Sequence, residues 1–475
     1  MAEATAAPVR RAPRDGSNLA AVIQAYMRTH SVGTTGEMAA ILGVDRTLVS
    51  KYLNGSRSCH DVSQLRHYAE AMDLPAETFG LVAAPDDRPA AGAPDDEEAQ
   101  QWRLVRRTLN RHRVELTKMA ADLYWDPIRV AGTTCISRAD WMPAEPVPLD
   151  SIELDWNPGA PQPAVIGSEP ASATSRPHGP TGERYARYSQ AIRALASPAL
   201  FENRGSYRLL NLDWSTGTGR MTYGYTTYFD MVDVCEPLAH ELADVWLQRG
   251  ESGKRIGLED LPYRKDIGDL FDLARRPVLP SVNTLTIRRG KDGDSFFLHR
   301  RGSGRVTLAA GLSHVIPAGV FQPSGIAPWN MAGDFDLWRN ILREMSEELL
   351  GNPEHDGSSG APINYDGQEP FRTLNEGVRA GAVRSWCLGV GLDPLAPAGE
   401  ILTVVTIDAD VFDEAFSGMV ATNAEGDIVQ SEPGVAGIPW TLPNIQRVTR
   451  DEPLACAAAA CIGLTWKHRS LILGD

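Results

Sequence analysis

Two stretches without apolar periodicity divide the 475-residue sequence and so limit what it can fold into. Residues 83–98 consist mainly of alanine, proline and acidic residues, and residues 157–183 contain six prolines. Segments of this composition bury too little apolar surface to form a core, and they are typical of linkers or long loops. The sequence therefore predicts several folded parts joined by such segments.

The division predicts a multidomain chain of about three domains of about 150 residues each. Hydrophobic residues make up 43% of the chain, which is enough for packed cores. The expected parts are a helical domain at 17–81, a linker at 82–100, an amphipathic helix with an extension at 101–156, a Pro-rich linker at 157–183, an α/β middle region at 184–276 and a C-terminal domain at 277–475.

Composition excludes several classes of protein. The longest nearly apolar stretch, 453–466, is shorter than the ~20 residues of a membrane-spanning helix. Residues 1–15 lack the apolar core of a secretory signal, and the six cysteines are scattered without a C-x-x-C pair. We therefore expect a cytoplasmic protein with reduced thiols. A formal net charge of −15 argues against non-specific coating of nucleic acid, but it permits a local DNA-reading module.

The N-terminal part is predicted to be helical over 19–29, 35–43, 46–54 and 62–72. Gly43, Val44 and Asp45 form a short turn between the second and third helices. Ala39 lies four residues before Gly43 and lets two helices approach closely, while Val49, six residues after it, fills the angle between them. This spacing suits a helix-turn-helix. The stretch EMAAILGVDRTLVSKYLNG resembles the lambda-repressor-like DNA-binding domains.

That resemblance implies a recognition helix over 45–53 that enters the major groove of DNA. It places Arg46, Thr47 and Ser50 at bases or phosphates, and Lys51 and Arg57 near the DNA backbone. Such domains usually bind paired half-sites as homodimers. The alternative is a small helical bundle for protein contact, because residues 1–80 hold eight basic and eight acidic residues.

The middle of the chain carries no clear functional motif. Residues 101–123 predict one amphipathic helix, whose arginine-rich faces suit either a phosphate-contacting or dimer surface or, more simply, solvent. His240 and Glu241 do not belong to an H-E-x-x-H zinc motif, and we expect them on a helix surface. The aromatic cluster at 223–229 is typical of a sheet core.

The C-terminal part begins with a predicted β-hairpin over 281–302, followed by a helix over 335–351. Leu337, Ile341, Met345 and Leu349 form its apolar stripe. The other face is expected to carry Arg343, Glu344, Glu347 and Glu348. Three carboxylates within about one turn repel one another unless water or a cation neutralises them, and Mg²⁺ suits such oxygen ligands. A solvated acidic face is the alternative.

The segment Arg343–Glu348 resembles the R-E-U-x-E-E core of the Nudix hydrolases, and the preceding strands and the Pro-Ala-Gly turn also resemble that family. The resemblance implies an α/β/α sandwich. It implies Mg²⁺ ligation by Glu347 and Glu348, with Glu344 as a further ligand or base, the carbonyl of Gly319 as another ligand, and Arg343 holding the carboxylates. It also implies attack of water on a diphosphate linked to a nucleoside or similar group.

The segment departs from the family's pattern in three ways, in the loop before this helix and at the end of the helix. From Gly319 to Arg343 the spacing is about ten residues longer than in the family. Phe335 stands where the family has a glutamate, and Leu350 stands where it has a glycine, with Gly351 one residue later. The altered loop favours ligand sensing, whereas the three glutamates favour catalysis.

The sequence thus leads to two functional hypotheses. In the first, the chain is a DNA-binding transcriptional regulator whose Nudix-like domain binds a nucleotide-type or other diphosphate ligand as effector. In the second, it is a Mg²⁺-dependent Nudix pyrophosphohydrolase with an appended DNA-tethering domain. A protein-interaction scaffold is a third option, supported only by the balanced charge of the N-terminal part. We favour the regulator.

Overall fold

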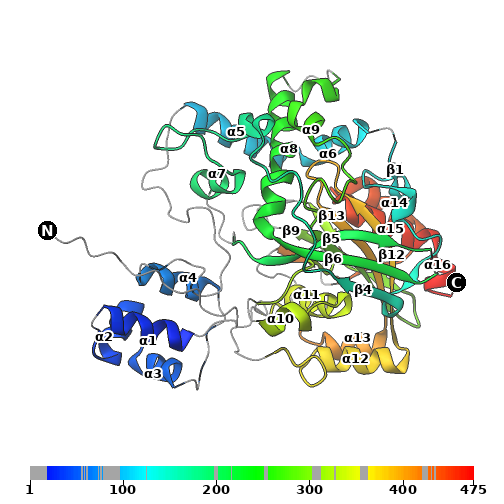
Figure 1. Cartoon of the computed structure of the whole chain (residues 1–475). Coiled ribbons are helices and arrows are strands. Elements are labelled where there is room, and N and C mark those ends of the chain that lie inside the picture. Colours follow the sequence, from blue (N-terminus) through cyan, green and yellow to red (C-terminus); the bar gives the residue numbers. More distant parts are fainter. Residues whose placement is uncertain are drawn as a thin grey trace. The chain divides into compact units, whose positions relative to one another are not determined.

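The structure is a computed structural model, and it describes residues 19–30, 32–54, 57, 59, 62–72, 74, 78, 97–124, 126–196, 202–215, 217–250, 255–301, 312–325, 328–352, 362–419, 426–428, 430–432 and 435–474. These residues fall into two compact units. The first lies within 1–84, 323–334 and 355–363, and the second holds the rest. The chain is thus multidomain, with a helical N-terminal part and a mixed α/β part (Figure 1). Most of the expected 82–100 linker lies outside the described residues.

The N-terminal part has four helices in its described residues: α1 (Leu19–Thr29), α2 (Thr35–Leu42), α3 (Arg46–Leu53) and α4 (Val62–Ala71). All four were predicted from the sequence. Their apolar faces meet in one core that includes Ile23, Leu42, Val49 and Tyr68. The hydroxyl groups of Tyr52 and Tyr68 lie 3.3 Å apart inside it.

The second unit is built on a mixed sheet of nine strands among the described residues. At its centre β7 (Pro280–Arg289) and β13 (Gly399–Asp408) run parallel, and β12 (Val383–Leu392) pairs antiparallel with β13. The short strands are β1 (Ile128–Arg129), β2 (Ile136–Ser137) and β3 (Val147–Pro148) on the β12 side, and β8 (Ser295–Phe296), β11 (Ala318–Val320) and β17 (Ile438–Pro439) on the β7 side. The predicted hairpin over 281–302 is confirmed only near its turn, where β8 pairs with β7, because residues 298–301 pair with other strands in a separate sheet.

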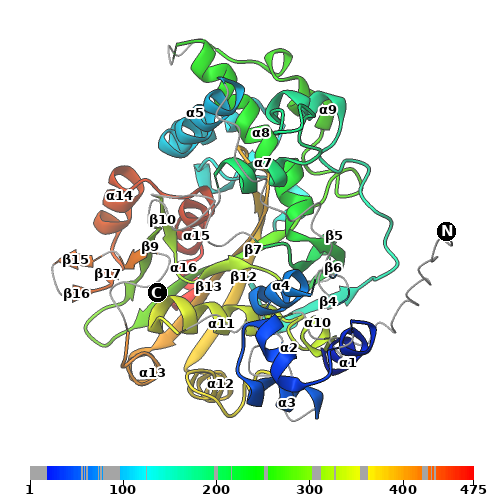
Figure 2. The ribbon, with the colours of Figure 1, turned by 90° about the vertical axis from the view of Figure 1, so that its left-hand side faces the viewer.

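Helices cover both sides of this sheet. α15 (Cys456–Lys467) packs on β7, β12 and β13, and α11 (Leu337–Leu350) packs on β7 and β11. Figure 2 shows α11 and α15 on opposite sides of these strands. The remaining elements of the C-terminal part are α10 (Pro328–Gly333), which belongs to the first unit, α12 (Phe371–Ala380), α13 (Ala409–Ala415), α14 (Leu442–Asp451), α16 (Arg469–Ile472), and the strands β9 (Leu298–Arg301), β10 (Ser313–Val315), β14 (Gly426–Ile428), β15 (Gln430–Glu432) and β16 (Val435–Ala436).

The middle region packs into the same compact unit as the C-terminal part. Its helices α5 (Glu97–Arg111), α7 (Tyr188–Leu195) and α8 (Tyr228–Gln248) share a core that also includes Leu279 and Leu395. The other elements are α6 (Arg113–Asp122), α9 (Pro262–Ile267), the 3₁₀ turns at Val130–Gly132, Ala139–Trp141, Leu149–Ser151, Pro170–Ser175 and Leu258–Asp260, and a sheet of β4 (Ile152–Trp156), β5 (Gly205–Asp213) and β6 (Gly219–Thr227). The expected separation of 101–276 from 277–475 is therefore not seen.

Two predictions for the middle region were wrong. Residues 101–123 form parts of two helices, α5 and α6, that meet at His112. Two of their arginines, Arg106 and Arg113, are buried and do not reach solvent. Of the two alternatives for residues 157–183, the linker is wrong and the long loop is right, because Ser172, Ser175 and Arg176 are buried, and the indole N–H of Trp102 donates to Ser175 O at 3.0 Å. Such contacts give this proline-rich segment a fixed place on α8.

His240 and Glu241 are buried, so their expected place on a helix surface was wrong. They lie in the middle of α8, which is covered by other elements. Tyr188 Oη is 2.9 Å from His240 Nδ1, and the Glu241 carboxylate accepts hydrogen bonds from Tyr263 N at 2.7 Å and Arg264 N at 3.0 Å. Glu241 thus caps the first turn of α9, and both residues have a structural role.

We expect acid to destabilise the second unit through His240. Burial lowers the pKa of His240 to about 3, whereas an unfolded chain binds this proton near pH 6.5. The stabilisation is therefore complete above pH 6.5 and is lost as the pH falls from 6.5 towards 3, by about 1.4 kcal/mol per pH unit. Urea unfolding at pH 7 and pH 5 measures this loss, which should shrink by about 2 kcal/mol in His240→Gln. An equal loss of stability in the wild-type and His240→Gln proteins would contradict the assignment of this loss to His240.

In the part of the chain that the structure describes, no helix is both long enough and apolar enough to span a bilayer.

Candidate functional site

The turn between α2 and α3 is specified by its own residues. Thr34 Oγ1 accepts a hydrogen bond from Glu37 N at 3.2 Å, and Glu37 accepts one from Thr34 N at 3.0 Å, which forms a capping box at the start of α2. Gly43 ends α2 with a φ of 65°, which glycine adopts without steric cost. Asp45 begins α3 by accepting a hydrogen bond from Thr47 N at 2.7 Å, and hydrogen bonds from Thr47 lower the pKa of Asp45.

The two faces of α3 differ sharply in exposure. Val49 and Tyr52 are buried, and Ala39 of α2 is buried beside them in the same core. The residues predicted to contact DNA are all exposed: Arg46, Thr47, Ser50, Lys51 and Arg57. The helical repeat places the first four on neighbouring positions of one face.

Two contacts hold the ends of this exposed face. Arg46 Nε donates to Thr35 Oγ1 at 3.2 Å, so the side chain bridges the starts of α2 and α3. The backbone N–H of Arg57 donates to Lys51 O at 3.2 Å, which holds Arg57 next to the last turn of α3. The structure therefore brings the five predicted residues together on one surface.

The helix that carries the predicted carboxylates, α11, has the apolar stripe expected from the sequence, and its bounds lie just inside the predicted 335–351. Its four apolar residues at 337, 341, 345 and 349 are buried. Asp336 begins α11 by accepting a hydrogen bond from Arg339 N at 2.9 Å, and Gly351 ends it with a φ of 67°. The glycine one residue later than in the Nudix pattern is thus the C-terminal cap of the helix.

The carboxylates of α11 do not form a solvated face. Glu348 is only 3% exposed, and it accepts a hydrogen bond from Ala318 N at 3.4 Å. Glu344 lies against Gly319, where an added Cβ atom would come within 2.0 Å of the Glu344 carboxylate carbon. Glu347 is partly buried. The expected placement of Glu348 on the outer face was therefore wrong, because this part of α11 faces β11.

Arg343 is also buried, at 4% exposed, so its expected place on the outer face was wrong as well. Its guanidinium donates to Tyr365 Oη at 2.9 Å and to Gln322 O at 2.8 Å. It thereby ties α11 to the segment that follows β11 and to the segment before α12. These bonds position the helix that carries the three glutamates.

Some oxygen atoms on and beside α11 are of the kind that binds a hard divalent cation. Glutamate carboxylates and a backbone carbonyl such as that of Gly319 are the ligands that Mg²⁺ prefers. Among the residues that the structure describes, however, no group of three or more His, Cys, Asp or Glu side chains is gathered as a metal site. Magnesium binding by Glu344, Glu347, Glu348 and Gly319 therefore stays a prediction.

Phe335 stands at the position where the Nudix family has a glutamate, and its side chain packs in an aromatic cluster. Its ring packs against Trp156, Tyr207, Tyr223 and Phe321, with ring centroids 4.9 to 5.9 Å apart. These partners lie on or beside the sheet of β4, β5 and β6. The cluster confirms Tyr223 as a core residue, and it fixes Phe335 to the middle region. The prediction of a sheet core at 223–229 holds only in part, because Tyr225 is 38% exposed and Tyr228 and Phe229 lie in α8.

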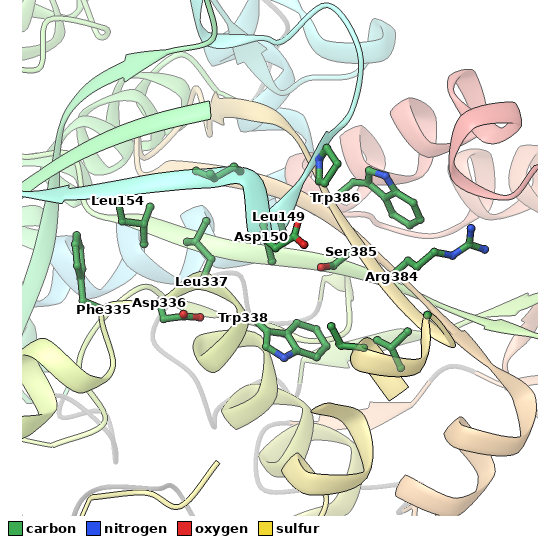
Figure 3. Close-up of a pocket in the computed structure, with 15 residues that line it drawn as sticks. Leu149, Asp150, Leu154, Phe335, Asp336, Leu337, Trp338, Arg384, Ser385 and Trp386 are labelled. Atoms are coloured by element: carbon green, nitrogen blue, oxygen red, sulfur yellow. The ribbon is translucent and has the colours of Figure 1, made fainter. Parts of the chain in front are cut away.

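A pocket of about 690 Å³ lies beside the first turn of α11 (Figure 3). It is lined by residues 148–154, by 335–338, by the end of α12 and by the first residues of β12. The sequence did not predict this pocket, although it drew attention to Phe335 and Leu337 for other reasons, because segments that lie almost 240 positions apart meet only when the middle region packs on β12.

Comparison of the chain with protein-family models finds no match, and comparison with curated proteins finds none either.

Proposed function

We propose that this chain is a cytoplasmic DNA-binding transcriptional regulator whose Nudix-like C-terminal part binds a nucleotide-type or other diphosphate ligand as effector. The observation that carries the proposal is the contrast on α3. Its buried face packs into the N-terminal core, while Arg46, Thr47, Ser50 and Lys51 are exposed after a short turn. A helix presented in this way suits a major groove, with the positive charges near phosphates.

We also propose that the chain binds DNA as a homodimer, as the lambda-repressor-like domains that it resembles usually do. A recognition helix that reads only a few bases gains specificity when two copies occupy half-sites about one helical turn apart. The operator expected for this chain is therefore a pair of related half-sites.

The ligand part of the proposal is supported by the burial of Glu348 and Arg343 and by the close approach of Glu344 to Gly319. On a helix that only faces solvent, these charged side chains would stay exposed to water. In this proposal Glu344, Glu347 and Glu348 hold Mg²⁺, which neutralises a bound diphosphate. Glu344 would position a water, and Arg343 acts through the backbone segments it holds.

A hydrolase is the second candidate, because all three glutamates of the Nudix-like segment are present on α11. In that case the chain is a Mg²⁺-dependent pyrophosphohydrolase of nucleoside diphosphate derivatives, and the N-terminal part tethers it to DNA. The fused α2–α3 unit and Phe335 in the loop favour the regulator, because neither serves hydrolysis.

The two candidates are separated by Glu348→Gln. In the regulator, the wild-type chain should bind Mg²⁺ and show metal-dependent thermal stabilisation by one nucleoside diphosphate derivative, with little phosphate release. We expect the Mg²⁺ affinity of the variant to fall by about 10-fold to 100-fold, because a carboxylate ligand loses its charge. Isothermal titration measures the Mg²⁺ affinity. A phosphate assay on nucleoside triphosphates, ADP-ribose and dinucleotides measures phosphate release.

Glu376→Gln is the matched control, because this glutamate is exposed on α12 rather than on α11, and forms an ion pair with Arg372. Turnover that disappears in Glu348→Gln but persists in Glu376→Gln would make the chain an enzyme first. Equal Mg²⁺ affinity in all three chains would contradict the metal site on α11.

A further inference from the structure

The pocket beside α11 has the walls of a site for a flat ligand. Its volume of about 690 Å³ lies within the range of small-molecule sites. Trp338 and Trp386 are among its lining residues, together with apolar side chains; Trp386 is only 7% exposed and belongs to the core that includes α15, so Trp338 is the more exposed of the two indoles. Trp338 Nε1 donates to Asn375 Oδ1 at 2.8 Å, so this ring has a fixed orientation. Preformed aromatic walls favour planar ligands, because stacking costs little conformational entropy.

Charged groups stand at different points of the pocket (Figure 3). Asp336 lies at the end near Leu154 and Phe335, Arg384 lies at the other end near Trp386, and Asp150 lies between them. Asp150 and Arg384 are exposed, so their charges reach solvent and a ligand. The Arg384 guanidinium is 5.7 Å from the centroid of the Trp386 ring. This contact holds the guanidinium at the rim of the pocket.

The carboxylates and the arginine suit a ligand that has hydrogen-bond donors at one end and a phosphate at the other. Carboxylates accept charge-assisted hydrogen bonds from the amino or ring N–H groups of a heterocycle. The planar fork of arginine matches a phosphate. The spacing along α11 also separates this pocket from the glutamates, because Asp336 and Glu344 are eight residues and so about 12 Å apart along the helix axis.

We propose that this pocket binds a purine nucleoside monophosphate unit, with the base along Trp338, its amino or N–H group at Asp150 or Asp336, and the phosphate at Arg384. The assignment rests on the proposed function only in taking the ligand to be nucleotide-type. It adds a metal-independent site for the nucleotide portion of the effector, apart from the carboxylates of α11.

The test is isothermal titration of the full chain with AMP, GMP and adenosine in buffer that contains EDTA, which leaves any metal site empty. The wild-type chain is expected to bind AMP or GMP more tightly than adenosine. Arg384→Gln should weaken nucleotide binding by about tenfold and leave adenosine within about twofold, because only the phosphate contact is lost. Arg450→Gln is the control, because Arg450 is exposed on α14, outside the pocket, and forms an ion pair with its neighbour Asp451.

Asp336→Asn provides a second variant that keeps the fold, since asparagine begins helices as well as aspartate does. It should weaken both the nucleotide and adenosine by a similar factor. If the wild-type chain binds neither AMP nor GMP, the proposal that this pocket binds a nucleotide is wrong. Equal affinity for AMP in the wild-type and Arg384→Gln chains would also overturn it. The same preparations are tested for DNA binding, so that intact DNA binding without AMP binding removes this site and leaves the regulator standing.

Discussion

Replacement of Arg46 and Lys51 by alanine is expected to weaken binding to the DNA upstream of the protein's own coding region by about 100-fold at moderate salt. Arg46 stands at the first turn of α3, where base edges are read, and loss of a good base contact costs about 1–3 kcal/mol. Lys51 stands one turn later, and loss of a phosphate contact weakens binding to all sequences. Both side chains are exposed, so the fold should survive the change.

Fluorescence anisotropy with a labelled promoter fragment measures this effect at several salt concentrations. The slope of log affinity against log salt should become shallower by about 1, because one phosphate contact is gone. Arg28→Ala is the control, since Arg28 is exposed at the end of α1 and outside the proposed surface. Unchanged affinity and slope in the double variant would remove α3 from the DNA contact.

Replacement of Arg106 by methionine is expected to destabilise the second unit by about 3–5 kcal/mol, because breaking a buried ion pair leaves an unneutralised charge. Arg106 forms an ion pair with Glu236, whose side chain is 1% exposed. This pair joins α5 to α8 within the core of the middle region. The loss is therefore expected to lower the unfolding temperature of that unit, measured by calorimetry on the full chain.

The double variant Arg106→Met with Glu236→Leu separates charge from packing. It should recover most of the lost stability, since apolar pairs of similar volume replace buried ion pairs at little cost. Arg107→Met, at the next and exposed position of α5, should change stability by less than about 0.5 kcal/mol. If Arg106→Met behaves like Arg107→Met, the buried pair does not stabilise the core.

The elements that the sequence could predict are those set by local patterns. The spacing of Ala39, Gly43 and Val49 predicts the α2–α3 turn, and the step of four from Leu337 to Leu349 predicts α11. In both cases the signal lies within one helix or one turn. The exposure of Arg46, Thr47, Ser50 and Lys51 follows from the same repeat, whereas Arg57 lies beyond the end of α3.

The missed features depend on partners that are distant in the sequence. Arg106 is expected in solvent from its charge, and it becomes buried only because Glu236 faces it across two helices. Glu348 is expected on an acidic surface from its spacing, and it becomes buried only because β11 packs beside it. The pocket at Trp338 requires residues 148–154 to lie next to β12. A local pattern carries no information about these tertiary contacts.

The most direct test of the account is the DNA affinity of the full chain with and without ligand. Anisotropy titrations with the promoter fragment are made in Mg²⁺ alone and with saturating nucleotides or ADP-ribose. The account predicts that one compound changes the DNA affinity by at least about fivefold, and that DNA changes the affinity for that compound by the same factor. Tight DNA binding that no bound compound alters would contradict the regulator.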